Sequence, residues 1–249
     1  MNQVIETLIN HRSIRSFEDK ALTQEQIELI VRSAQAASTS SYIQAYSIVG
    51  VTDPSKKKRL AELAGNQPYV ERNGHFFIFC ADLYRHDQIG RMEKADVITS
   101  IESTEKFMVA IIDATLAAQN AAIAAESMGL GICYIGGIRN HLKEVCDIIK
   151  TPERVIPIFG LVVGYPNQLP DQKPRLSLNH IYHENEYEQN EERYKQELVE
   201  FNEVVSSYYQ ERTNGNRKES WTGQMAKLLE KQARMYMKEF IEEKKLNKK

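Results

Sequence analysis

Two arginines, a histidine and a serine lie within five residues near the start of the chain, in the segment His11-Arg12-Ser13-Ile14-Arg15. Guanidinium groups match the oxygens of phosphate and other delocalised anions in a bidentate manner. In a helical backbone Arg12 and Arg15 would share one face, because they are three residues apart. Taken alone, the segment fits two interpretations, an anion-binding cluster and a solvent-exposed basic turn, because short motifs often match by chance.

Two further clusters carry small polar groups. Ser38-Thr39-Ser40-Ser41 is a run of hydroxyls, which suits a helix interior poorly but supplies many hydrogen-bonding groups. The turn Gly65-Asn66-Gln67-Pro68-Tyr69 holds the amide of Gln67 and the phenol of Tyr69. By itself, the hydroxyl run is also typical of an ordinary loop.

Two more clusters carry positive charge in the second half of the chain. Lys173-Pro174-Arg175 places two cations on a backbone that proline keeps stiff. Arg212 and Arg217 bracket the polar turn Thr-Asn-Gly-Asn, which also fits a plain connection between helices.

Several common sites are excluded by motif. The glycines around Gly129 and Gly131 precede an expected strand, whereas a dinucleotide-binding turn follows a strand and opens a helix, and Tyr134 stands where its third glycine belongs. There is no phosphate-binding loop of the Gly-x-x-x-x-Gly-Lys-Ser/Thr type and no His-Glu-x-x-His or Cys/His metal motif. Cys80 and Cys133 lie in apolar runs and are expected to be small core residues.

Composition indicates a globular protein with no electrostatic preference for nucleic acid or membranes. The chain has 249 residues, of which 42% are hydrophobic, and a formal net charge of −2. No positively charged segment followed by an apolar core opens the sequence, so we expect no secretory signal and a cytoplasmic location.

Strands and helices are expected to alternate through the first 170 residues, which predicts a sheet flanked by helices. Thr23 and Gln26 form a capping box before a helix over 25–37, and residues 107–128 predict a central helix whose alanines let a neighbour approach closely. The polar stretch 86–103 predicts a mobile excursion, either a lid or a disordered loop. The other expected helices are 2–10, 54–63 and 139–149, and the expected strands are 45–51, 75–83, 131–135 and 155–164.

Taken together and in order, the clusters resemble the nitroreductase-fold flavin enzymes, in particular the branch of flavin reductases and oxygen-insensitive NADPH nitroreductases. The resemblance runs over essentially the whole chain. It rests on these motifs: His11–Arg15, Ser38–Ser41, Gly65–Tyr69, Ala125–Gly131, Tyr134–Gly137, Lys173–Arg175 and Tyr208-Tyr209…Arg212…Arg217…Trp221.

The resemblance implies an α+β sandwich, a central sheet flanked by helices, in an intertwined homodimer with FMN at the subunit interface. It implies a core over residues 1–185 and a charged helical extension over 186–249 that is not an independent domain. The residues implied to bind FMN are His11, Arg12, Lys173 and Arg175 at the phosphate, Ser13, Arg15, Gln67 and Tyr69 near the ring, Ile135, Gly136 and Gly137 by their backbone, and Ser38, Thr39 and Ser40 from the partner subunit.

The same resemblance implies that NADPH is the electron donor and that Arg212 and Arg217 hold its 2′-phosphate. The implied reaction is a ping-pong transfer to free flavin, a quinone or a nitroaromatic compound, with no catalytic acid or base, and the 86–103 stretch helps to shape the acceptor site. Two other interpretations of the residues stay open, a non-enzymatic FMN carrier or flavin-state sensor and a flavin-free structural dimer, because fold does not fix function.

Overall fold

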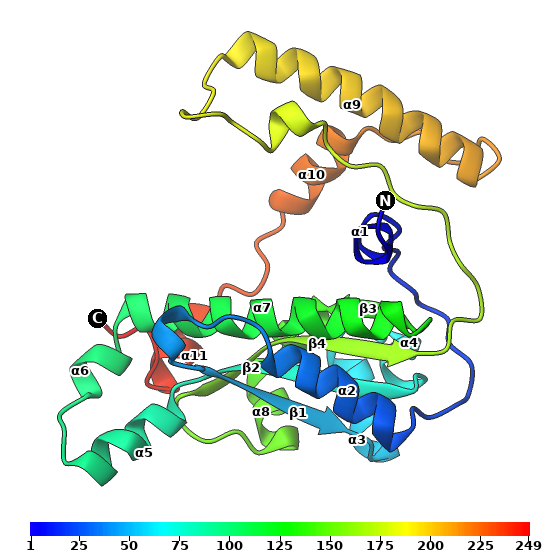
Figure 1. Cartoon of the computed structure of the whole chain (residues 1–249). Helices are drawn as coiled ribbons and strands as arrows, with labels where there is room; N and C mark the ends of the chain where they lie inside the picture. Colours follow the sequence, from blue (N-terminus) through cyan, green and yellow to red (C-terminus); the bar gives the residue numbers. More distant parts are fainter. The chain divides into compact units, whose positions relative to one another are not determined.

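The computed structural model describes residues 1–249 (Figure 1). The chain divides into two compact units. The first contains residues 1–170 together with 234–249, and the second contains residues 171–233. The boundary that we predicted at residue 185 therefore differs from the division in the structure, and the last sixteen residues belong to the first unit.

A four-stranded antiparallel sheet in the order β1-β2-β4-β3 forms the centre of the first unit. Antiparallel pairing with helices on the faces defines an α+β architecture, as predicted. The strands are β1 (Tyr46–Val51), β2 (His75–Asp82), β3 (Gly131–Ile135) and β4 (Val155–Gly164).

Strand β2 is buried along its whole length, which explains its nearly continuous apolar sequence. Its side chains alternate between the two faces of the sheet, because successive residues of a strand point to opposite sides. Phe76 and Ile78 join one core cluster, and Phe77 and Phe79 join the other. The sheet is therefore covered by helices on both faces.

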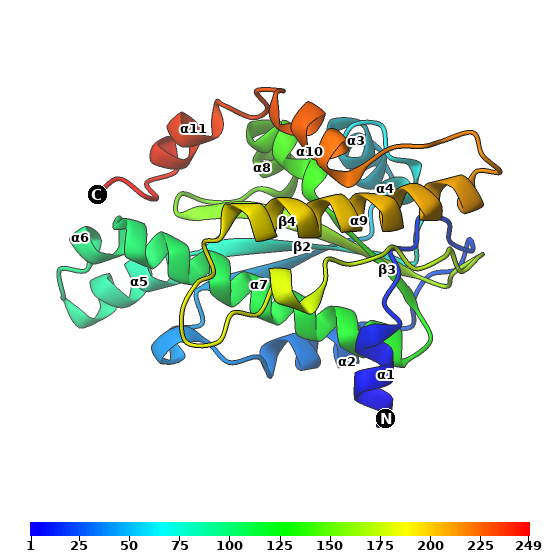
Figure 2. The same cartoon turned by 90° about the horizontal axis from the view of Figure 1, so that it is seen from above.

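Helices α2 (Gln24–Gln35) and α7 (Thr104–Ser127) cover one face of the sheet side by side (Figures 1 and 2). The predicted capping box starts α2, with the Thr23 hydroxyl on the Gln26 amide and the Gln26 side chain on the Thr23 amide. Seven alanines of α7 are almost fully buried, so α2 and the sheet approach its backbone closely. Gly129, at φ +76°, ends α7 in the left-handed conformation that glycine favours.

Two polar side chains on α7 tie it to the segments around it. Asp113, which is fully buried, accepts hydrogen bonds from the backbone amides of Ser40 and Ala45, and Asn120 donates to the carbonyl of Ser33. By length and composition alone α7 could cross a membrane, but core helices of soluble proteins pass the same test. Half of its most apolar window is buried inside the protein, so we describe it as a core helix.

The opposite face of the sheet carries α3 (Pro54–Leu63), α4 (Pro68–Glu71) and α8 (Leu142–Ile149). Asp53 caps α3 by accepting from the amides of Ser55 and Lys56. The segment that we predicted as a turn at 65–69 is a turn only as far as Gln67, because Pro68 opens α4.

The prediction of a mobile excursion over 86–103 was wrong. The stretch forms α5 (Tyr84–Glu93) and α6 (Ile98–Ile101). Asp82 accepts hydrogen bonds from the first amides of α5, and Arg91 pairs with Asp87 one turn earlier. Polar groups with local partners therefore order this segment, although its weak apolar pattern did not predict a helix. The role of residues 86–103 at an acceptor site stays a prediction.

The residues that follow α11 (Met237–Glu243) at the C-terminus pack against the rest of the first unit. Leu246 is fully buried, and the backbone amides of Lys248 and Lys249 donate to the carbonyl of Glu102. Next to them, the buried Arg154 pairs with the Glu102 carboxylate at 2.9 Å and donates to the carbonyl of Lys245.

The second unit contains two helices, α9 (Glu191–Arg212) and α10 (Trp221–Leu229), which pack against each other. Phe201 of α9 meets Trp221 edge to face at 5.6 Å. Asn202 ties the start of α10 to α9, because it exchanges two hydrogen bonds with Thr222.

We expect Arg154→Met to lower the free energy of unfolding by about 3 kcal/mol, because the substitution leaves the Glu102 carboxylate buried without a partner. Arg59→Met is the matched control, since Arg59 pairs with Glu62 at 2.8 Å on the exposed surface and such pairs contribute about 0.5 kcal/mol. Urea denaturation measures both changes. Equal effects of the two substitutions would contradict the proposed role of the buried pair.

Candidate functional site

Residues 11–15 are extended and lie along the edge of the sheet beside β3. Ser13 forms a parallel bridge with Ile132, and the Ile14 amide donates to the Ile132 carbonyl at 2.8 Å. The backbone is therefore not helical, and Arg12 and Arg15 do not share a face. Alternation along the extended chain sends Arg12 and Ile14 to a pocket and Arg15 to the other side.

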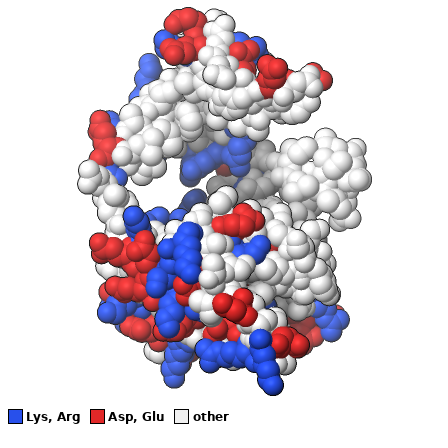
Figure 3. Space-filling model, turned by 90° about the vertical axis from the view of Figure 1, so that its left-hand side faces the viewer, with Lys and Arg blue, Asp and Glu red and all other residues white.

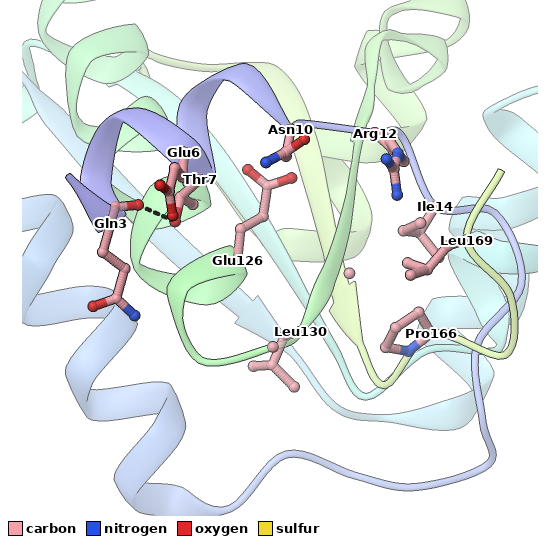
Figure 4. A pocket seen from close by; sticks show the side chains of 12 residues that line it. Gln3, Glu6, Thr7, Asn10, Arg12, Ile14, Glu126, Leu130, Pro166 and Leu169 are labelled. Atoms are coloured by element: carbon pink, nitrogen blue, oxygen red, sulfur yellow. Dashed lines mark hydrogen bonds between the residues drawn. The ribbon is translucent and has the colours of Figure 1, made fainter. Parts of the chain in front are cut away.

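The pocket has a volume of about 400 Å³ and lies between α1 (Gln3–Ile9), the end of α7 and the start of β3 (Figure 4). It combines apolar side chains with one cation, Arg12, and two carboxylates, Glu6 and Glu126. Its lining consists of Gln3, Glu6, Thr7, Asn10, Arg12, Ile14, Glu126, Gly129, Leu130, Gly131, Pro166 and Leu169.

The guanidinium of Arg12 has an unsatisfied group in this pocket. Its Nε atom is buried and has no hydrogen-bond partner within the protein. A buried polar group without a partner costs free energy unless a ligand or a water molecule forms a hydrogen bond with it. An anionic group bound in the pocket fits this requirement.

His11 is oriented by a carboxylate that the sequence did not single out for the site. Its Nδ1 atom lies 2.7 Å from Oε1 of Glu126 on α7. This contact leaves Nε2 of His11 available to another group. The signal in the sequence was a glutamate near the end of an otherwise alanine-rich helix.

A second cluster forms on the other side of the extended segment. Burial raises the pKa of the Tyr69 phenol, and the nearby cation of Arg15 partly opposes this effect. Gln67, two residues earlier, donates from Nε2 to the carbonyl of Ala64 at 2.7 Å. The structure thus brings Arg15 and Tyr69 together, with Gln67 in the same turn.

The backbone after β3 approaches this turn closely. A Cβ atom added to Gly137 would lie 2.2 Å from the Ala64 carbonyl oxygen and 2.9 Å from Nε2 of Gln67. Gly137 and the preceding Ile135 are buried. Glycine at position 137 is therefore required for contact between the end of β3 and the Gln67 turn.

The hydroxyl run lies elsewhere in the same chain. Asp113 holds it through the Ser40 amide, and Asp113 precedes Glu126 by thirteen residues in α7. At 1.5 Å per residue, this spacing corresponds to about 20 Å along the helix. One chain therefore does not bring Ser38, Thr39 and Ser40 to the His11 cluster.

The backbone of this run is held in an unusual conformation. Ser41, Tyr42 and Gln44 have φ values of 49°, 59° and 53°, which non-glycine residues rarely adopt. Arg85 supports the segment by donating to the Gln44 carbonyl at 2.8 Å, and His86 contacts the Ile43 carbonyl at 2.8 Å. Such a fixed strained loop is typical of functional sites.

The four other predicted basic residues lie in the second unit. Lys173 and Arg175 are both exposed, and Arg175 donates to the Lys173 carbonyl at 2.8 Å. Arg212 and Arg217 flank the predicted turn between α9 and α10, in which Gly215 has φ +83°. Each arginine contacts a tyrosine of α9, Arg212 through the hydroxyl of Tyr208 at 2.9 Å and Arg217 over the ring of Tyr209 at 4.0 Å.

Two family models match the chain and divide it near the boundary between its units. The model described as "Nitroreductase family" matches residues 8–165, and the one described as "Nitroreductase family, C-terminal domain" matches residues 173–249.

Curated and solved relatives match over nearly the full length. The chain is 55% identical to the "FMN reductase (NADPH)" of Bacillus subtilis (strain 168), with 100% of both chains covered. Among solved structures, it resembles B. megaterium NfrA1 at 64% identity and a TM-score of 0.98, with 99% of this chain and 100% of that one covered. The NfrA1 nitroreductase of B. subtilis follows at 55% identity and a TM-score of 0.97, with the same coverage.

We expect Gly137→Ala to lower the free energy of unfolding by about 2 kcal/mol, because the added methyl group meets rigid backbone. Gly136→Ala is the matched control, since its Cβ would meet only the movable end of Arg139, at 3.2 Å, and should cost less than about 1 kcal/mol. Urea denaturation of both variants is the measurement. If the two variants are equally stable, the close approach does not constrain residue 137.

Proposed function

The chain belongs to the nitroreductase family, and from this membership we propose that it is an FMN-dependent oxidoreductase that takes electrons from NADPH. The name of the B. subtilis relative, at 55% identity over the full length, supports both the cofactor and the donor. The structural observation that carries the proposal is the buried, unpartnered Nε of Arg12 in a pocket next to His11.

The residues of the first unit fit the two ends of FMN. His11 and Arg12 supply the cationic and hydrogen-bonding groups that a phosphate requires. Ser13, Arg15, Gln67 and Tyr69 supply polar groups suited to the edge of a flavin ring, and the backbone of residues 135–137 approaches Gln67 closely. Lys173 and Arg175, which lie in the second unit, stay predicted phosphate ligands.

FMN, when bound, would supply the hydride-accepting chemistry of a ping-pong cycle between NADPH and a second substrate. The chain's own contribution is binding and electrostatics. Arg15, which lies near Tyr69, would supply a positive charge that favours an anionic reduced ring. We assign no side chain as a general acid or base.

We propose that the protein works as a homodimer in which the partner subunit supplies the hydroxyl run. One face of α7 exposes apolar side chains, with Met108 at 52%, Ile112 at 45% and Leu116 at 44% exposure. Helix α1 has no buried residue, although Val4, Ile5, Leu8 and Ile9 are apolar. Exposed apolar stripes of this kind mark interaction surfaces, and a second copy is the partner that also brings Ser38–Ser40 to a His11 cluster.

NADPH is the proposed donor, with Arg212 and Arg217 at its 2′-phosphate. Both side chains are exposed on the loop between α9 and α10, where a substrate that binds and leaves in each cycle can reach them. The proposed acceptors are flat molecules that take the place vacated by the nucleotide, namely free flavins, quinones and nitroaromatic compounds.

We propose a cytoplasmic location and no nucleic-acid or membrane partner. The net charge of −2 supports this, as does the interspersion of Lys and Arg with Asp and Glu on the face shown in Figure 3. The proposed donor, NADPH, is a cytoplasmic metabolite, which is consistent with the same location.

The function is tested by anaerobic visible absorption spectra of the purified protein, recorded before and after addition of NADPH or NADH. We expect a flavin band that NADPH bleaches faster than NADH. Arg212→Ala should raise the NADPH concentration needed for half-maximal bleaching rate about tenfold, as expected for one lost charge-assisted contact, and leave the NADH value nearly unchanged. Equal effects on both nucleotides would contradict the role of Arg212.

The other outcomes separate the alternatives. A flavin band that neither nucleotide bleaches would favour a carrier or sensor of FMN. Absence of flavin even after incubation with FMN would contradict the cofactor assignment.

The dimer is tested by Ile112→Glu, which places a charge on the exposed face of α7. We expect dissociation to monomers in analytical ultracentrifugation and loss of bound FMN, because each site then lacks the partner's hydroxyls. Met92→Glu on α5, at a side chain that is 76% exposed, is the control and should change neither property. A monomeric variant that retains FMN would contradict the shared site.

A further inference from the structure

The two arginines of the α9–α10 loop differ in their partners. Arg212 donates to the neutral hydroxyl of Tyr208 and takes part in no ion pair. Arg217 donates from both Nε and Nη2 to a single carboxylate oxygen, Oε2 of Glu219, at 3.0 and 2.7 Å. One of the two proposed phosphate ligands is therefore already neutralised by an acid from its own loop.

The geometry around Arg217 leaves few positions for an incoming anion. The ring of Tyr209 covers one face of the guanidinium at 4.0 Å, and Glu219 occupies the edge formed by Nε and Nη2. The Arg217 amide donates to the Thr213 hydroxyl, which in turn donates to the Tyr209 carbonyl. These local bonds hold the base of the side chain while Glu219 competes for its charged end.

We infer that Glu219 is an internal counter-ion that competes with the 2′-phosphate of NADPH for Arg217, and that it thereby sets the affinity for NADPH relative to NADH. This inference rests on the proposed function. A phosphate that binds Arg217 must either displace the carboxylate or lie beside it, and both cost affinity through lost pairing or like-charge repulsion. NADH has no 2′-phosphate, so its binding does not meet this competition.

The expected size of the effect is moderate, because the pair is exposed. The side chains of Arg217 and Glu219 are 43% and 45% accessible, and solvent and salt screen such pairs. Competition of this size weakens NADPH binding only a few-fold. It also speeds the departure of NADP⁺, which a ping-pong cycle requires before the acceptor can enter.

The test is isothermal titration of FMN-loaded protein with NADP⁺ and with NAD⁺, neither of which reduces the flavin. We expect Glu219→Gln to bind NADP⁺ about three- to fivefold more tightly than the wild type at low salt, with unchanged NAD⁺ binding and a smaller gain at 0.5 M salt. Glu211→Gln is the matched control, because it removes one negative charge from the end of α9 where no ion pair is formed. It should leave the affinity for NADP⁺ within the error of the wild-type value.

A double-mutant cycle of Glu219→Gln with Arg217→Ala tests whether Glu219 acts on NADP⁺ binding through Arg217. If the counter-ion acts through Arg217, Glu219→Gln should have no effect on NADP⁺ affinity in the Arg217→Ala background. The fluorescence of Trp221, the single tryptophan, reports whether the loop and the start of α10 keep their structure in each variant.

The outcomes separate this inference from the proposed function. If Arg217→Ala weakens NADP⁺ binding but Glu219→Gln leaves it equal or weaker, Glu219 positions the arginine and the counter-ion inference is overturned, while the NADPH assignment stands. If the wild type fails to discriminate NADP⁺ from NAD⁺ and Arg217→Ala has no effect, the assignment of the loop and the inference are both overturned.

Discussion

The candidate site depends on α7, a helix that packs tightly on the sheet because its buried face consists mostly of alanines. Close packing fixes this helix relative to the strands. Its few polar side chains therefore hold the segments that they contact in fixed positions. Asp113 holds the loop that bears the hydroxyl run by two backbone amides. Glu126, near the other end, orients His11. A single helix thus positions two sets of predicted ligands that lie about 20 Å apart in one chain.

This separation makes the dimer a physical requirement of the proposed site. The exposed apolar face of α7 contains Met108, Ile112 and Leu116, while its opposite face is buried against the sheet. A helix with apolar residues on both faces is expected to be buried on both, here within an assembly. In the proposed dimer, association through α7 would bury that surface and bring hydroxyls of one copy toward the basic cluster of another, so that stability and ligand binding would depend on the same contact.

The sequence predicted most helices and strands, because these leave local signals, and its assignment of site residues stays a prediction. The capping box at Thr23, the apolar run of β2 and the terminal glycine of α7 are local patterns, and the structure places each as expected. The helices over 86–103 escaped prediction because their order comes from hydrogen bonds and ion pairs, not from an apolar stripe. Arg12 and Arg15 would share a face only in a helical backbone, but pairing with β3 extends the backbone and sends them to different sides. That pairing joins residues far apart in sequence, so no local pattern could reveal it.

The structure distinguishes two ways of presenting an arginine to a phosphate, and they match two kinds of ligand. Arg12 keeps a buried Nε without a protein partner, so a bound anion removes an existing cost and is expected to stay. Arg217 is exposed and already paired with Glu219, so an anion there must compete and gains less. The first arrangement suits a resident cofactor and the second a nucleotide that enters and leaves in every cycle. A chain that needs both can achieve the difference with one residue type, because burial and the neighbouring carboxylate, and not the guanidinium itself, set the strength of each contact.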